Sequence, residues 1–153
     1  MTSTVTTSDI AKNMADACAT VSSEIARTDG KSSLLLAFNG AVLAGLASLA
    51  DKDLPLPTKV FGAAAVLALG AAAVLLLLVV RPRISGADRA SFPYWAQLDE
   101  DAIRDCMQGD PRAARIRVLS GLAVRKFLHL RRAVDLILTA LALLTLAAAG
   151  TAL

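Results

Sequence analysis

Three polar residues around the first apolar run have the chemistry that most needs an explanation. In TDGKSSLLLAFNGAVLAG, which begins at Thr28, Asp29 and Lys31 directly precede a long apolar stretch and Asn39 lies inside it. An amide in that setting can donate and accept hydrogen bonds across a helix interface, which is worth ~0.6–2 kcal/mol in lipid. Two interpretations of Asn39 stay open: it holds helices together, or it lines a path for water or ions.

Residues suited to catalysis are scarce. The chain has one histidine, His129, in a basic stretch beside the third apolar run, where a lone histidine is typically lipid-facing or snorkelling. Cys18 and Cys106 form no CxxC pair, and HExxH, P-loop and GxSxG motifs are absent from the sequence. The acidic residues 99–101 are adjacent, so their carboxylates cannot share one helix face as a metal site. We therefore expect no enzyme, no metal site and no cofactor.

Three apolar blocks determine the expected fold. Residues 32–50 and 60–80 contain no charge, and residues 133–153 contain only Asp135. A helix rises ~1.5 Å per residue, so these blocks span about 28–32 Å, close to the ~30 Å hydrocarbon thickness of a bilayer. The sequence thus predicts an all-α integral membrane protein with three transmembrane helices. A soluble alanine-rich bundle and a cleaved signal peptide are the less favoured alternatives.

The placement of basic residues predicts the orientation of the chain. Residues 81–132 contain 11 basic and 6 acidic residues, and arginines flank both neighbouring apolar blocks. By the positive-inside rule this segment is cytoplasmic. With three spans, residues 1–31 are then cytoplasmic as well, and the C-terminus lies outside. Contact with anionic lipid is the simplest account of these cations.

Helical periodicity continues outside the blocks. Apolar residues at spacings of three and four predict one amphipathic helix before the first block and another before the third. These residues are Ile10, Met14, Ala17, Val21 and Ile25, then Ile116, Leu119, Ala123, Phe127 and Leu130. Asp110 is expected to cap the second helix, with Pro111 at its first position. Gly30 offers a joint between the first helix and the membrane.

Small residues recur at every fourth position in the first two blocks. Ala37, Ala41 and Gly45 form one stripe, and alanines at 64, 68 and 72 form another. Such stripes let membrane helices approach closely. Because three spans of small residues make a poor pore alone, we expect a homo-oligomer.

In combination these segments resemble the Pycsar effector membrane proteins, the PycTM family. The first membrane helix of that family has Asp-x-Lys, then small residues and leucines, then Asn-Gly, which Asp29, Lys31, Asn39 and Gly40 match here. The Arg81–Pro82 pair, the aromatic SFPYW segment and the helix carrying Leu119, Ser120, Lys126 and Ala133 also match. The family often has a fuller Phe-Phe-Gly-type segment in place of SFPYW. The resemblance extends from about residue 10 to the C-terminus.

The resemblance implies a bacterial antiphage effector in the inner membrane. In such systems a nucleotide cyclase makes cCMP or cUMP on infection, the cyclic pyrimidine mononucleotide activates the effector, and the membrane loses integrity, which causes abortive infection. The implied partners are the cyclic nucleotide, membrane lipid and, functionally, the cyclase, with no nucleic acid. The alternative is a small structural or regulatory membrane subunit that binds a protein partner through its cytoplasmic helices.

One set of candidate residues concerns gating or helix packing. It comprises Asp29, Lys31, Asn39, Gly40 and Gly45. Asp29 and Lys31 lie at the expected cytoplasmic edge of the first span. They either anchor the helix at a fixed depth or act as a hinge that transmits a cytoplasmic event to it.

A second set concerns nucleotide binding. A phosphate needs cations held by folded backbone, and the planar fork of arginine can bind it with two hydrogen bonds. The hypothesis is a pocket at the membrane edge formed from Arg81, Arg83, Arg125 and Lys126, with Tyr94 or Trp95 stacking on the base. The alternative is that these cations contact lipid headgroups and that the aromatic residues are interface anchors.

Overall fold

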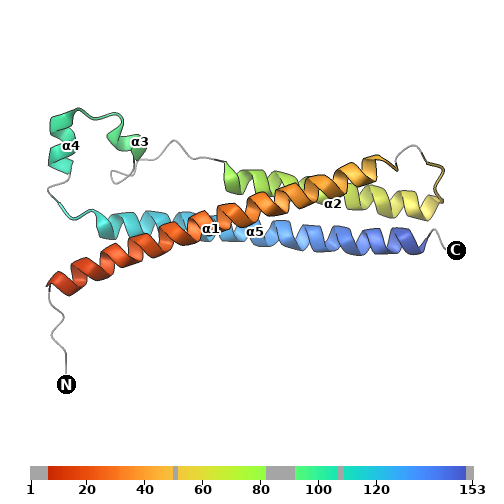
Figure 1. The fold of residues 1–153 in the computed structure, drawn as a ribbon, viewed down its shortest axis with the longest axis horizontal. Coiled ribbons are helices and arrows are strands. Elements are labelled where there is room, and N and C mark those ends of the chain that lie inside the picture. The colour runs from red at the N-terminus through yellow and green to blue at the C-terminus, as the bar shows by residue number, and fades with distance from the viewer. Residues whose placement is uncertain (1–6, 50–51, 82–91, 107–108, 151–153) are drawn as a thin grey trace, which may run out of the picture. The chain divides into compact units, whose positions relative to one another are not determined.

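The regular secondary structure among the described residues is entirely helical. The computed structural model describes residues 7–49, 52–81, 92–106 and 109–150, and no strand occurs among them. The helices are α1 (Thr7–Ala47), α2 (Leu56–Val80), α3 (Phe92–Trp95), α4 (Glu100–Cys106) and α5 (Arg112–Ala149) (Figure 1). Helices α1, α2 and α5 are each long and apolar enough to cross a membrane. The predicted all-α class with three transmembrane helices is confirmed.

The chain divides into two units, each with its own packing. The bundle unit comprises residues 28–81 and 126–153, and the amphipathic unit comprises residues 1–27 and 82–125. Helices α1 and α5 each contribute residues to both units. The boundary in α1 lies between Arg27 and Thr28, and the boundary in α5 lies between Arg125 and Lys126.

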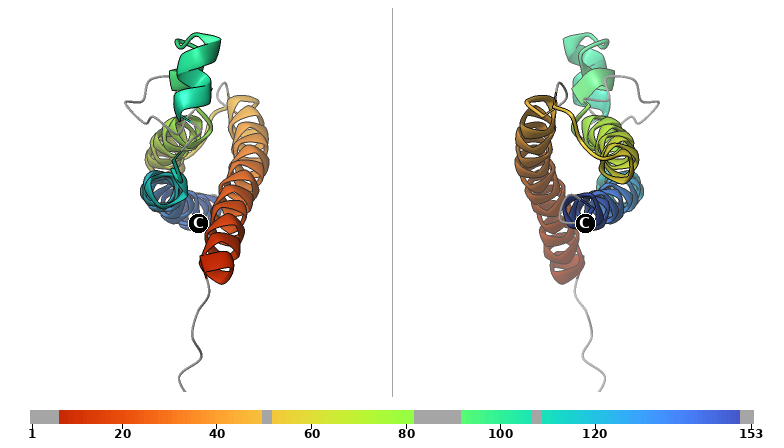
Figure 2. Two further views of the ribbon diagram at one scale, coloured as in Figure 1. Left: turned by 90° about the vertical axis from the view of Figure 1, so that its left-hand side faces the viewer. Right: turned by 90° about the vertical axis from the view of Figure 1, so that its right-hand side faces the viewer.

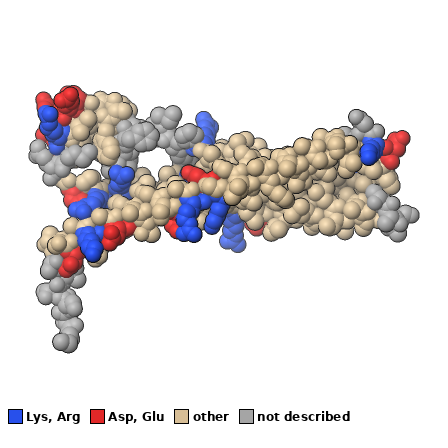
Figure 3. All heavy atoms as spheres, in the orientation of Figure 1, with Lys and Arg blue, Asp and Glu red and all other residues tan. Residues whose placement is uncertain are grey.

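The core of the bundle unit comes from α2 and α5. Its fully buried apolar residues follow spacings of four and three, which place them on one face of each helix. The core cluster consists of Ala65, Leu69, Ala72, Leu76, Ala133, Ile137 and Ala140. Half-buried leucines of α1 pack against it, and end-on views show the three helices around a common centre (Figure 2). On the face shown in Figure 3, charged side chains lie at the two ends of this unit and its middle is uncharged.

The buried stripe of α2 differs from the predicted one. Small residues were expected at 64, 68 and 72, but only Ala72 of these is fully buried, and the stripe runs through Ala65, Leu69 and Leu76 instead. The reason is that leucines of α2 fill the space between the helices, while its alanines let the neighbouring helices come close. A count of small residues alone therefore does not identify the buried face.

Helix ends follow local signals. Helix α2 begins after Pro55, with a proline at its start, where the missing N–H is not needed. Asp99 Oδ1 accepts the Ala102 N–H at 2.8 Å at the start of α4. At the start of α5, Asp110 Oδ1 accepts the Arg112 backbone N–H at 3.1 Å, which confirms the predicted cap.

Helix α1 continues through Gly30, so the expected joint is absent. A glycine inside a helix costs only ~1 kcal/mol relative to alanine, which tertiary packing can offset. Thr28 and Ser32, on either side of it, are buried in the bundle unit. Their burial keeps the helix regular across the glycine.

The amphipathic unit lacks a fully buried side chain among its described residues. The predicted apolar stripes are only half-buried there, as at Met14 and Val21 of α1 and Ile116 and Leu119 of α5. Ile10 remains 47% exposed. The stripes therefore shield one another only partly within one chain.

Candidate functional site

An ion pair joins α1 to α5 at one end of the bundle unit. The Lys126 ammonium donates to both carboxylate oxygens of Asp29, with Nζ–Oδ1 at 2.6 Å and Nζ–Oδ2 at 2.8 Å. The Lys126 side chain is 15% exposed and that of Asp29 is 37% exposed. Helical register brings them together, because Asp29 adjoins buried Thr28 and Lys126 lies two turns before buried Ala133. The pair is more shielded from water than an ordinary surface salt bridge.

A side-chain amide joins α1 to α2 further along the bundle. Asn39 is 0% exposed, and its Nδ2 donates to the Leu69 carbonyl oxygen at 2.8 Å. Its Oδ1 is buried and has no hydrogen-bond partner in the described part of the chain. The Nδ2 hydrogen bond agrees with the interpretation that Asn39 holds helices together. Oδ1 takes no part in that contact.

A hydroxyl joins α2 to α5 at the other end of the bundle unit. Thr58 Oγ1 donates to the Ala147 carbonyl oxygen at 3.1 Å. A Cβ at Gly150 would lie 3.2 Å from the same hydroxyl oxygen, which is a tight contact. Each pair of the three helices is therefore connected by a polar contact: α1–α5 through Asp29, α1–α2 through Asn39, and α2–α5 through Thr58.

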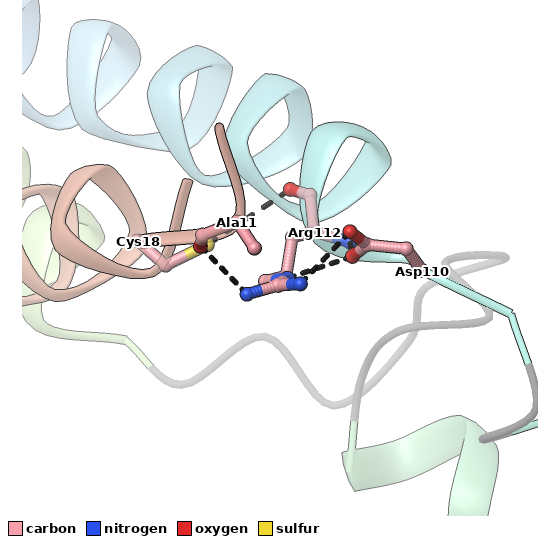
Figure 4. A network of polar contacts seen from close by, with 4 residues as sticks. All are labelled: Ala11, Cys18, Asp110 and Arg112. Atoms are coloured by element: carbon pink, nitrogen blue, oxygen red, sulfur yellow. Dashed lines mark hydrogen bonds and ion pairs between the residues drawn. The ribbon is translucent and has the colours of Figure 1, made fainter. Parts of the chain in front are cut away.

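Arg112 is the centre of a polar network in the amphipathic unit (Figure 4). Its guanidinium donates to Asp110 through Nε at 2.8 Å and Nη2 at 3.0 Å, and through Nη1 to the Ala11 carbonyl oxygen at 2.7 Å. The Cys18 thiol lies 3.9 Å from the Arg112 carbonyl oxygen and donates to it. The Arg112 side-chain and backbone hydrogen bonds lower the pKa of Asp110. These contacts hold the start of α5 against α1.

The predicted nucleotide-binding residues fall in both units. Arg81 is exposed at the end of α2 and belongs to the bundle unit with Lys126, whose ammonium is occupied by Asp29. Tyr94 and Trp95 are half-buried in α3, and Arg125 is exposed on α5, all in the amphipathic unit. Arg83 lies outside the described residues. The pocket stays a prediction.

The predicted gating residues have unlike environments. Asp29 and Asn39 make the interhelical contacts described above, whereas Lys31 is exposed on α1. Gly40 and Gly45 are also exposed, and a Cβ added to either would meet no other atom within 4 Å. Neither glycine is therefore needed for close packing inside the described chain.

Sequence reasoning missed several of the contacts. Thr28, Ser32 and Thr58 are buried polar residues of the bundle unit, and Arg112 organises the other unit. The spacing of Thr28, Ser32 and Asn39 on one helix face was the available signal for the first two. Nothing local singles out Thr58. Among the described residues, no group of three or more His, Cys, Asp or Glu side chains is placed to hold a metal ion.

Fold and contacts together define a class: a small all-α membrane protein with a three-helix bundle stabilised by interhelical polar contacts. The family model described as Pycsar effector protein domain (PycTM) matches residues 13–153. The chain therefore belongs to the Pycsar effector family. No curated protein and no solved structure matches the chain significantly.

Proposed function

We propose that this Pycsar effector is activated by a cyclic pyrimidine mononucleotide, cCMP or cUMP, and then impairs membrane integrity to cause abortive infection. The observation that carries the proposal is the family match, which covers all but the first 12 residues and so includes α2, α5 and all of α1 from residue 13 onward. In this proposal the chain lies in the bacterial inner membrane, with residues 1–31 and 81–132 cytoplasmic and the C-terminus outside, because of the basic residues between the second and third spans.

The Asp29–Lys126 pair suggests how an anion would act on the bundle. An ammonium that already binds a carboxylate at 2.6 Å is held in place by folded backbone, as a phosphate ligand must be. Asp29 accepts two hydrogen bonds from the Lys126 ammonium, which has three N–H donors, so a nucleotide phosphate that binds Lys126 through more than one oxygen competes with Asp29. Binding would therefore weaken the contact that joins α1 to α5.

The proposal includes a homo-oligomer in the membrane. Ala37, Ala41 and Gly45 lie on the exposed face of α1, and Leu34 beside them is 74% exposed. Small residues on a lipid-exposed face allow close approach of another helix. A second copy of this chain is the proposed occupant, and lipid is the alternative.

The test is calorimetric titration of the purified full chain in detergent with cCMP, cUMP, cAMP and cGMP, followed by dye release from liposomes. We expect one pyrimidine nucleotide to bind and trigger release, and Arg125→Gln combined with Lys126→Gln to abolish binding and the nucleotide-dependent part of the release. Arg117→Gln is the control, because Arg117 is an exposed arginine of α5 outside the proposed pocket. Binding that is equally strong in the double variant would refute the pocket. Absence of release from the wild-type chain with every nucleotide would refute the activation.

A further inference from the structure

The buried polar residues of the described chain all lie in the bundle unit. They are Thr28, Ser32, Asn39 and Thr58. The first three lie on α1 at spacings of four and seven, which place them on one inward face. Ser32 Oγ donates to the Thr28 carbonyl oxygen at 2.8 Å and Thr58 donates to α5, so these hydroxyls are satisfied. Asn39 differs, because its buried Oδ1 has no partner there.

Asn39 lies near the middle of the membrane-spanning part of α1. Ten residues separate it from Asp29, which corresponds to ~15 Å of helix, about half of a ~30 Å hydrocarbon layer. Its contact Leu69 is likewise near the middle of α2. An acceptor at this depth is costly without a donor, since neither lipid tails nor apolar side chains supply one. Holding α1 to α2 requires only the Nδ2 donor and does not account for the oxygen.

We propose that Asn39 is a hydration site: its Oδ1 is unpaired in the packed bundle described above, here called the closed state, and is bound by water in the state that impairs the membrane. This inference rests on the proposed function and adds the residue at which water binds inside the bundle. The inward face formed by Thr28, Ser32 and Asn39 is the polar surface available to that water. An unsatisfied acceptor raises the free energy of the closed state, so it favours the hydrated state by roughly 5- to 150-fold.

Replacing the amide separates the two roles of Asn39 by sign. If Asn39 only holds α1 to α2, Asn39→Val and Asn39→Leu loosen the bundle. If its oxygen is the hydration site, the same variants remove an unpaired acceptor whose cost exceeds the contribution of the one Nδ2 hydrogen bond lost with it, so they tighten the bundle. Two variants are used because their fits differ: leucine keeps the branching and the number of heavy atoms of asparagine but has bulkier methyl groups, whereas valine is one heavy atom shorter. Ser33→Ala is the matched control, since its exposed hydroxyl bonds back to the Asp29 carbonyl oxygen at 3.0 Å.

The first measurement needs no nucleotide. The purified full chain is unfolded in mixed micelles of increasing SDS fraction and followed by circular dichroism. We expect at least one of Asn39→Val and Asn39→Leu to unfold at a higher SDS fraction than the wild type, and Ser33→Ala to match the wild type. Unfolding of both Asn39 variants at the wild-type SDS fraction or below would overturn the hydration site.

The second measurement is dye release from liposomes that contain the full chain, with cCMP and cUMP as separate probes. We expect the stabilised Asn39 variant to need at least about fivefold more nucleotide for half-maximal release. If the wild type leaks and both Asn39 variants release dye at the same nucleotide concentration as the wild type, the inference is overturned. A wild type that leaks with neither probe would contradict the proposed activation instead, and the micelle experiment alone would then decide the hydration site.

Discussion

Removing one partner of the Asp29–Lys126 pair should destabilise the bundle to an extent that depends on which partner is lost. The Lys126 side chain is 15% exposed, whereas that of Asp29 is 37% exposed. Asp29→Asn leaves an ammonium largely shielded from water, and Lys126→Gln leaves a carboxylate that water reaches more easily. From the cost of leaving a charged group without its partner, we expect the free energy of unfolding to fall by about 2 kcal/mol for Asp29→Asn and by about 1 kcal/mol for Lys126→Gln.

The contribution of the pair itself follows from a double-mutant cycle. With the Nζ–Oδ2 distance at 2.8 Å, the Coulomb attraction is about 6 kcal/mol at an effective dielectric constant of about 20. Desolvation of each ion costs several kcal/mol in a buried site and less in this partly exposed one. Exposed pairs contribute about 0.2–1 kcal/mol, so a coupling energy of about 1–2 kcal/mol is expected for this half-shielded pair.

The assay is unfolding of the wild type, both single variants and the double variant in mixed micelles of increasing SDS fraction. Arg27 and Glu24 provide a matched control, because their pair at 3.0 Å is 68% and 43% exposed. Arg27→Gln should therefore change the free energy of unfolding by no more than about 0.5 kcal/mol. A coupling energy for Asp29 and Lys126 as small as that control, or a larger loss for Lys126→Gln than for Asp29→Asn, would refute the reasoning.

Two further predictions concern the amphipathic unit. The Arg112 side chain, and then its backbone N–H, hold the pKa of Asp110 below its ordinary value of 3.8. This stabilising contribution is complete above the ordinary value and is lost as the pH falls through the folded value, so the start of α5 should fray only in strong acid. Carbon-13 NMR titration of the Asp110 carboxyl tests this, and a pKa at or above 3.8 would contradict it. The second prediction is that amides of the amphipathic unit exchange with deuterium faster than those of the bundle unit, because no described side chain there is fully buried. Equal protection in detergent, read by mass spectrometry, would show that another contact covers the half-buried stripes.

The fold was largely predictable because its signals are local. Blocks of membrane length with at most one charged residue predicted the three long helices, and Asp110 with Pro111 predicted the start of α5. The joint at Gly30 was wrong, since burial of the residues around it outweighs the weak helix propensity of glycine. Local signals thus predicted the helices well, and errors arose where tertiary packing decides.

The candidate contacts were only half predictable, for a geometric reason. Asp29 and Lys126 were both selected from the sequence, one for gating and the other for nucleotide binding, yet they lie 97 residues apart and pair with one another. Periodicity specifies the face of a helix that a residue occupies, but it does not specify the partner helix or its register. Asn39 was identified as an amide in an apolar run. That its Oδ1 has no partner among the described residues depends on which atoms of α2 the amide meets, and the sequence does not specify these.

The distribution of burial makes α1 the helix on which a signal would act most easily. Every fully buried apolar residue in the described bundle belongs to α2 or α5, and the buried residues of α1 are Thr28, Ser32 and Asn39. Since lipid tails are as apolar as leucine, helix association in a bilayer depends on packing and polar contacts. Helix α1 is then held by half-buried leucines, by the Asn39 amide and by the Asp29 carboxylate. Within the bundle unit, an anion that takes Lys126 from Asp29 would remove one of the two polar side-chain contacts described between α1 and the other helices, and it would leave the α2–α5 core intact.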